Sequence, residues 1–205
     1  MYIPAHFAVN DQAALHDLMR RFSFATLVTQ HEGRLFATHL PLLLHADAGE
    51  HGTLIGHMAR ANEQWRDFER GVEALVIFQG DHSYISPSWY ETFPAVPTWN
   101  YMVAHAYGTA RVIDDEARVC AVLGELVAKH EAGFAEPWPM DLPEDYLRTM
   151  MRAIVAFEMP IARLEGKFKL SQNQPERNRE RVIAMLAASE DATERELAAQ
   201  MKERS

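Results

Sequence analysis

Cysteine is almost absent from this sequence, since Cys120 is the only one among 205 residues. A single cysteine cannot form a disulfide within the chain, and neither a second cysteine nor a matching histidine pattern accompanies it to indicate a zinc site. We therefore expect Cys120 to be a small apolar residue on the flank of a helix.

Long apolar runs are also missing. No stretch approaches the roughly 20 apolar residues that a membrane-spanning helix needs. The first residues, MYIPAHFAVNDQ, lack the basic and apolar segments of a secretory signal. These absences predict a cytoplasmic protein without a membrane partner.

The sequence has no excess of positive charge, because its formal net charge at pH 7 is −9. A broad nucleic-acid-binding surface needs clustered Lys and Arg, so the charge argues against one but leaves room for a local basic patch. A Walker phosphate loop, a Rossmann glycine fingerprint and a Gly-x-Ser-x-Gly elbow are missing too. Nucleotide hydrolysis and nucleophilic catalysis therefore have no support.

The chain does contain enough apolar sequence for a sizeable core, with 48% hydrophobic and 24% charged residues. Short runs rich in β-branched and aromatic residues, separated by Gly, Pro, Asp and Asn, predict strands. These runs are 24–30, 35–44, 53–57, 73–80, 83–88, 100–113 and 153–166. Many short strands with few long helices between them predict a mainly β (α+β) fold, an antiparallel sheet or barrel of six or seven strands with flanking helices.

Helical spacing of apolar residues predicts helices over about 11–21, from Asp115 to near His130, and around 143–152. The sequence after Pro175 predicts two polar helices that are joined near Ser189. We therefore expect one domain over residues 1–174 and a helical tail over 175–205. The tail segment ATERELAAQM is similar to the positioning helix of a helix-turn-helix, but only KERS follows it, so two solvated helices are the favoured interpretation.

Residues 53–69, TLIGHMARANEQWRDFE, predict a strand that ends near His57 and a helix that begins near Asn62. The first N–H groups of a helix have no intrahelical partner and attract anions. Arg60 adds a guanidinium that suits a phosphate dianion. The segment is therefore a candidate phosphate seat, but taken alone it favours the simpler interpretation, a surface Arg beside an ordinary N-cap Asn.

Aromatic side chains and hydroxyl or amide groups alternate in residues 81–101, DHSYISPSWYETFPAVPTWNY. Aromatic rings stack on planar heteroaromatic ligands, while neighbouring hydroxyl and amide groups recognise the ligand edge. On this segment alone, core or interface packing is the favoured interpretation. His39, His57, His82 and His105 show no recognised metal-ligand spacing, so no metal site is predicted.

Seven segments in the same order resemble the PaiB-type negative transcriptional regulators: MYIPAHF, FATLVT, ATHLP, GHMARANEQW, FQGDHSYISPSWY, VPTWNY and KFKLSQNQ. The resemblance covers residues 1 to about 174. It implies a split β-barrel of the FMN-binding type, related in fold to pyridoxamine-phosphate oxidases and flavin reductases. It also implies a homodimer with FMN between the subunits.

The resemblance implies three groups of cofactor-binding residues. The flavin ring lies along Thr38, His39, Leu40 and Pro41. The phosphate seat comprises His57, Met58, Ala59, Arg60 and Asn62, with Trp65 one turn later. The residues expected near the dimer interface are Ser86, Ser88, Trp89, Thr98, Trp99 and Asn100. Glu63 departs from the family, which more often has Pro there, and a carboxylate near a phosphate is expected to weaken flavin binding.

The function implied is that of an FMN-binding, PaiB-like regulatory protein. A flavin-dependent oxidoreductase, either a reductase or oxidase or a haem-degrading split-barrel enzyme, is the alternative, since a fold does not fix a function. The negative net charge and the incomplete helix-turn-helix weigh against direct DNA binding. The lack of an evident acid–base pair weighs against the enzyme.

Overall fold

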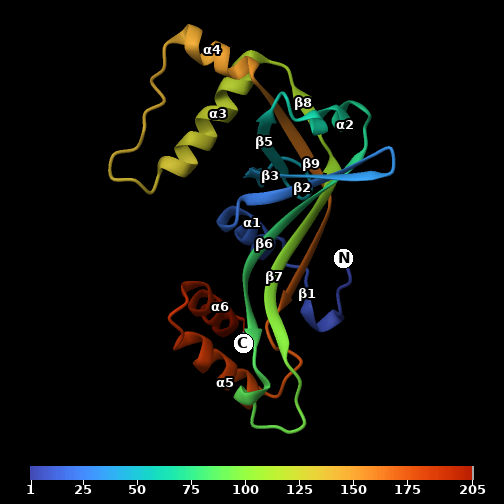
Figure 1. The fold of residues 1–205 in the computed structure, drawn as a ribbon, viewed down its shortest axis with the longest axis vertical. Helices are drawn as coiled ribbons and strands as arrows, with labels where there is room; N and C mark the ends of the chain where they lie inside the picture. The colour runs from blue at the N-terminus through green and yellow to red at the C-terminus, as the bar shows by residue number, and fades with distance from the viewer. Residues whose placement is uncertain (205) are drawn as a thin grey trace. The chain divides into compact units, whose positions relative to one another are not determined.

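The computed structural model describes residues 1–204, which divide into two compact units. Unit 1 comprises residues 1–18, 79–104 and 165 onward, and unit 2 comprises residues 19–78 and 105–164. Four elements cross from one unit to the other along the chain: α1 (Gln12–Arg21), β6 (Glu73–Ile85), β7 (Thr98–Thr109) and β9 (Ile154–Lys169). Figure 1 labels the elements in chain order.

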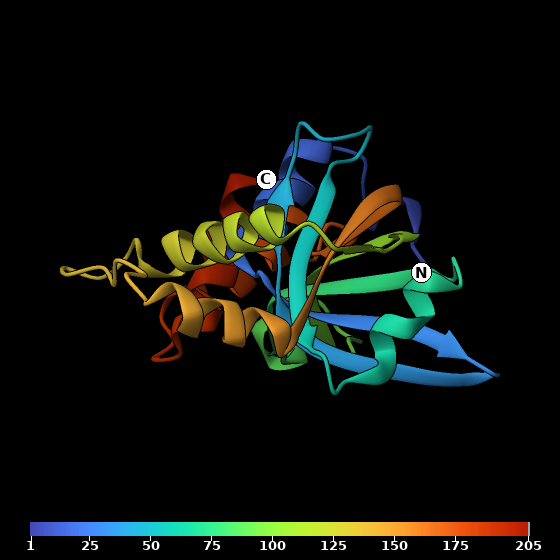
Figure 2. The ribbon, with the colours of Figure 1, turned by 90° about the horizontal axis from the view of Figure 1, so that it is seen from above.

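Unit 2 holds most of the strands and the two helices α3 and α4. Its strands are β2 (Phe24–His31), β3 (Arg34–Pro41), β4 (Leu43–His45), β5 (Thr53–Ala59) and β8 (Arg111–Ile113). Its helical elements are η2 (Glu63–Trp65), α2 (Arg66–Glu69), α3 (Glu116–Glu131) and α4 (Glu144–Arg152). Helices α3 and α4 lie side by side, as Figures 1 and 2 show, and Arg148 of α4 pairs with Glu116 of α3 at 3.2 Å.

Unit 1 holds the helical tail together with η1 (Ala5–Phe7), β1 (Ala8–Val9) and η3 (Pro87–Trp89). The tail consists of α5 (Glu176–Ala187) and α6 (Ala192–Glu203), which confirms the two expected helices. The buried apolar residues of these helices are Val182, Ile183, Leu186, Leu197, Ala198 and Met201. The expected domain boundary at residue 174 stays a prediction.

The strands form an antiparallel sheet in the order β3-β2-β6-β7-β9-β5-β4, with β1 and β8 each paired to β9. Strands β2 and β3 pair from Phe24 opposite Pro41 to His31 opposite Arg34. The hairpin turn expected at HEGR is present, with φ of 48° at Glu32 and 78° at Gly33. Two consecutive left-handed residues suit the twist of an antiparallel hairpin.

Within residues 1–204 the sheet has nine strands rather than the six or seven expected from the sequence. The run 73–80 and the first three residues of the run 83–88 form the single strand β6, because Gly80–His82 continue in extended conformation, and the rest of the second run turns into η3. The run 35–44 divides into β3 and β4 at Leu42, whose N–H donates to Ser23 O at 2.9 Å. The run 100–113 divides into β7 and β8 at Ala110, and the two-residue β1 has no periodicity by which it could be predicted.

Alternating apolar residues build the core of unit 2. Leu27, Val76, Phe78, Leu54 and Phe157 are each at most 1% exposed. Of the helices within residues 1–204, none combines the length and the apolar character needed to cross a bilayer.

Candidate functional site

Asn62 joins β3 to the residues that follow β5. Its Nδ2 donates to Thr38 Oγ1 at 2.8 Å, and its Oδ1 accepts from the backbone N–H of Gln64 at 3.1 Å. The helix expected near Asn62 is present but short, because it consists of the 3-10 turn η2 and the four-residue α2. So short a helix carries little macrodipole, and an anion at this corner would be held mainly by side chains.

Arg60 follows β5, and its side chain bonds to the backbone around the start of β9. Its Nε donates to Arg152 O at 2.8 Å, and its Nη2 donates to Ile154 O at 2.7 Å. Trp65 Nε1 in turn donates to Arg60 O at 3.1 Å. A guanidinium has five N–H donors, so these two bonds fix the side chain and leave further donors for an anion.

A cavity of about 180 Å³ lies beside Arg60 in unit 2. Its charged lining residues are Arg60, Arg148, Arg152, Asp114 and Glu116. Arg148 is held by Glu116 at 3.2 Å and by Glu144 at 2.6 Å. Within residues 1–204 the Arg152 side chain has no ion-pair partner. Arginines therefore outnumber carboxylates in this lining, which suits an anion.

The other residues expected along β3 and β5 divide between the core and the surface. Leu40 and Met58 are each 4% exposed and pack in the core, so their side chains are not available to a ligand. His39 and Ala59 are exposed. The His39 ring stacks with Phe24 at a centroid distance of 6.5 Å.

His57 occupies a half-buried position on β5, opposite Ala156 of β9. Its Nδ1 is buried and has no hydrogen-bond partner among the described residues. Burial lowers the pKa of His57 below its ordinary value near 6.5. The neutral ring therefore offers one nitrogen to a ligand.

We expect His57 to make the folded protein less stable as the pH falls. In the unfolded chain this histidine binds a proton near pH 6.5, whereas the folded chain binds it only at lower pH. Stability is therefore lost from about pH 6.5 down through the folded-state pKa. Urea unfolding at about pH 7 and about pH 5 should show a smaller pH-dependent loss in His57→Gln than in wild type.

His82→Gln is the control for this pH dependence, because His82 is exposed. This variant should lose stability as steeply as wild type. Equal pH dependence in wild type and His57→Gln would contradict the assignment.

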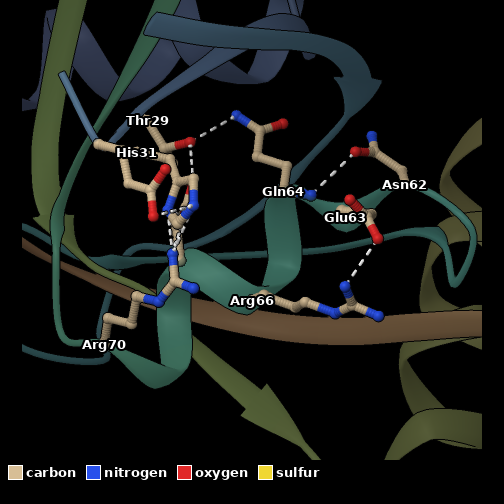
Figure 3. A network of polar contacts seen from close by, with 9 residues as sticks. Thr29, His31, Asn62, Glu63, Gln64, Arg66 and Arg70 are labelled. Atoms are coloured by element: carbon tan, nitrogen blue, oxygen red, sulfur yellow. Dashed lines mark hydrogen bonds and ion pairs between the residues drawn. The ribbon is translucent and has the colours of Figure 1, made fainter. Parts of the chain in front are cut away.

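Gln64 of η2 and Asp67 of α2 form the buried part of a polar network that joins these elements to β2 and β3. Figure 3 labels Thr29, His31, Gln64 and Arg70 of this network. Gln64 Nε2 lies 3.2 Å from Leu27 O, Thr29 Oγ1 and Phe36 O. Thr29 Oγ1 donates to Asp67 Oδ2 at 2.6 Å. These bonds hold the short helix that carries Trp65 against the sheet.

His31 and Arg70 form the solvent side of this network. His31 Nδ1 lies 3.2 Å from Asp67 Oδ1, and Arg70 Nη1 lies 3.5 Å from the same oxygen and also contacts His31. Sequence reasoning missed Gln64 and Asp67, because polar residues in a turn are usually exposed. The available signal was their spacing of three residues, with Phe68 next to Asp67, which puts all three on one helical face.

The candidates from residues 81–101 belong to unit 1, whereas those of β3 and β5 belong to unit 2. Ser86 and Ser88 form a hydroxyl pair at 2.7 Å. Asn100 is fully buried and donates to Ser171 Oγ at 2.9 Å, so its amide is committed to the interior of unit 1. Trp99 is 53% exposed, and its ring meets those of Tyr84 and His82 at centroid distances of 6.0 and 6.3 Å.

Two further candidates of unit 1, Thr98 and Trp89, accept hydrogen bonds from cationic side chains. Lys169 Nζ donates to Thr98 Oγ1 at 2.6 Å, and Arg181 Nε donates to the carbonyl oxygen of Trp89 at 2.8 Å.

Within residues 1–204, no three His, Cys, Asp or Glu side chains lie close enough together to hold a metal ion.

Comparison with known protein families gives a match over residues 1–163 to the family described as "Putative FMN-binding domain". The chain is also 35% identical over 205 residues to the protease synthase and sporulation protein PAI 2 of Bacillus subtilis (strain 168). That alignment covers 100% of this chain and 98% of the Bacillus protein. Both matches agree with the resemblance found in the sequence motifs.

Solved structures similar to this one confirm the fold. The flavocytochrome Anf3 from Azotobacter vinelandii matches with a TM-score of 0.63 and 16% identity, over 82% of this chain and 72% of that chain. The FAD and heme binding protein from Mycobacterium smegmatis matches with a TM-score of 0.60 and 18% identity, over 79% of this chain and 73% of that chain. The predicted split β-barrel of the flavin-binding type is thereby confirmed.

Proposed function

This chain belongs to the FMN-binding family of PaiB-type proteins, and from this membership we propose that the corner formed by β3, β5 and η2 in unit 2 holds FMN. The observation that carries the proposal is Arg60, which is fixed by two backbone carbonyls beside an arginine-lined cavity. FMN, the cofactor predicted from the sequence, supplies redox chemistry through its ring when bound. The protein supplies binding and orientation.

The residues at this corner fit both ends of FMN. Arg60 and Arg152 offer N–H donors for the phosphate, and the buried, unpartnered Nδ1 of His57 offers a polar contact for the ring. The carboxylate of Glu63, which the sequence analysis expects to weaken flavin binding, pairs with Arg66 at 2.6 Å. This pairing reduces the repulsion that Glu63 would exert on a phosphate.

The proposal includes a homodimer. Its support is the aromatic and apolar surface exposed in unit 1, where Phe93 is 96%, Val96 74% and Trp99 53% exposed. Light scattering tests it, and the mass of a single chain at micromolar concentration would remove the dimer from the proposal.

We further propose that the flavin-bound protein acts in regulation and resides in the cytoplasm. Similarity to the Bacillus protein PAI 2 supports the regulatory role. The net charge of −9 favours regulation without direct DNA contact. A gel-shift assay with promoter DNA and cell fractionation test these two parts. Bleaching of the bound flavin by NADH or NADPH would favour the oxidoreductase instead.

Arg60→Ala is expected to lower FMN affinity about ten- to hundredfold, the loss of a charge-assisted contact worth roughly 1.5–3 kcal/mol. Riboflavin lacks the phosphate, so its affinity should change little. Fluorescence titration of both flavins against wild type and variant measures the difference.

Two further variants sharpen this test. Arg152→Ala removes an arginine side chain from the cavity but keeps the backbone carbonyl of residue 152 that accepts from Arg60. This variant should also lower the affinity for FMN and leave the affinity for riboflavin unchanged. Arg118→Ala is the control, because Arg118 pairs with Glu125 at 3.3 Å and does not line the cavity. Equal losses for both flavins, or no loss in either cavity variant, would show that the phosphate does not bind here.

A further inference from the structure

Two lysines near the end of β9 lie on the same face of the strand. Lys167 and Lys169 are two residues apart, so their side chains point the same way. Lys167 is only 8% exposed, and Lys169 is half-buried. Lysine is almost never buried to this degree without a partner of opposite charge.

The partners of both ammonium groups are neutral. Lys167 Nζ donates to Tyr2 O at 3.3 Å and lies 5.5 and 5.2 Å from the ring centres of Tyr2 and Tyr101. Lys169 Nζ lies 2.6 Å from both Thr98 Oγ1 and Trp99 O. Each ammonium carries three N–H donors, so at least two on Lys167 and one on Lys169 are left for another acceptor.

No carboxylate within residues 1–204 forms an ion pair with either lysine. Glu165, which lies on the same face of β9, pairs with the amino group of Met1 at 2.7 Å. Burial, and then the charge of Lys167, lower the pKa of Lys169. Two positive charges therefore sit together in a partly dehydrated place, which is costly unless an anion compensates them.

The turn after β9 holds the lysines in position. Leu170 N donates to Gln172 Oε1, and Gln172 Nε2 donates to Phe168 O, both at 2.7 Å. Ser171 adopts a positive φ of 64° and accepts from the buried Asn100 at 2.9 Å. The segment KFKLSQNQ thus combines a rigid turn with a fixed pair of cations. A rigid pair loses little entropy when it binds a ligand.

We propose that Lys167 and Lys169 form a binding site for a phosphate-type oxyanion in unit 1. A phosphate dianion matches the two positive charges, and its oxygens accept the remaining N–H donors. The phosphate is either a free or metabolite-borne group or the phosphate of FMN, and the experiment distinguishes these sources. The lysine site shares no residue with the proposed FMN site around Arg60.

The test follows the melting temperature of the full chain during titration with inorganic phosphate, with chloride at matched ionic strength as reference. Ligand binding to the folded state raises the melting temperature of wild type. Lys167→Met and Lys169→Met should weaken the apparent phosphate affinity about tenfold or more. Lys169→Arg should keep the phosphate response, because it keeps the charge.

Lys129→Met is the matched control. Lys129 is another half-buried lysine with a pKa lowered by burial, but it lies in unit 2 and donates to Leu42 O at 3.4 Å. This variant should respond to phosphate as wild type does. Lysines that serve packing alone would shift the melting temperature equally in phosphate and in chloride, and that result would overturn the proposal.

Titrations with FMN and riboflavin identify the source of the phosphate. If the site takes the FMN phosphate, both Lys→Met variants lose affinity for FMN and not for riboflavin. If it takes another phosphate, inorganic phosphate stabilises wild type while the ratio of the two flavin affinities stays unchanged in the Lys variants. Absence of both effects refutes the lysine site, whatever the Arg60→Ala titration shows for the flavin corner.

Discussion

Replacing Gly108 by Ala is expected to destabilise unit 2 by about 3 kcal/mol, at the upper end of the usual cost of overpacking. Gly108 is a buried residue of β7, and a Cβ atom there would overlap the carbonyl oxygen of Pro160 in β9. Because both partners are strand backbone, no side-chain rotation relieves the overlap. For a chain of this size the melting temperature should fall by roughly 6–12 °C.

Gly166→Ala is the matched control in unit 1. A Cβ at Gly166 would overlap the side chain of Leu15, which can change rotamer, whereas the Pro160 carbonyl cannot move alone. This variant should cost about 1 kcal/mol, the lower end of the usual cost of overpacking. If the Gly108→Ala variant were as stable as Gly166→Ala, the prediction would be wrong, because β7 and β9 could then move apart at little cost in stability.

Local sequence was sufficient to predict most of the elements. Alternation along β2, the positive φ at Gly33 and the N-cap at Asp115 each depend on residues a few positions apart, so a pattern in the sequence reveals them. β6 was predicted as two strands, because Gly80 and Asp81 usually mark a turn. In the structure, pairing within the sheet keeps both residues extended.

The geometry of the candidate sites could not be predicted in the same way. The carbonyl partners of Arg60 lie 92 and 94 positions away, and Tyr2 lies 165 positions from Lys167. Contacts of that separation depend on which strands become neighbours, and one sequence does not contain this information. Motif resemblance selected Arg60, but only the fold shows what fixes its guanidinium and which cavity lies beside it.

Phe157→Ala is expected to have the largest effect on the core, with a loss of about 3–5 kcal/mol in the free energy of unfolding. Phe157 is fully buried on β9, opposite Gly56 of β5, and its ring lies 5.0 Å from that of Phe68 in α2. Removing the ring leaves a cavity under the helix that carries Trp65. Urea unfolding measures the loss, and Phe157→Leu should cost only about 1–2 kcal/mol because it fills most of the space.

Phe157→Ala also distinguishes an indirect structural effect on flavin binding from the loss of a direct contact with the phosphate. Phe157 does not itself line the cavity beside Arg60, and its ring packs against Phe68, so we expect Phe157→Ala to weaken flavin binding by loosening α2 and the η2 turn before it. FMN and riboflavin should therefore lose affinity by the same factor, in contrast to the selective loss of FMN in Arg60→Ala. A loss confined to FMN in Phe157→Ala would contradict this separation, because it would place the phosphate next to α2 rather than beside Arg60.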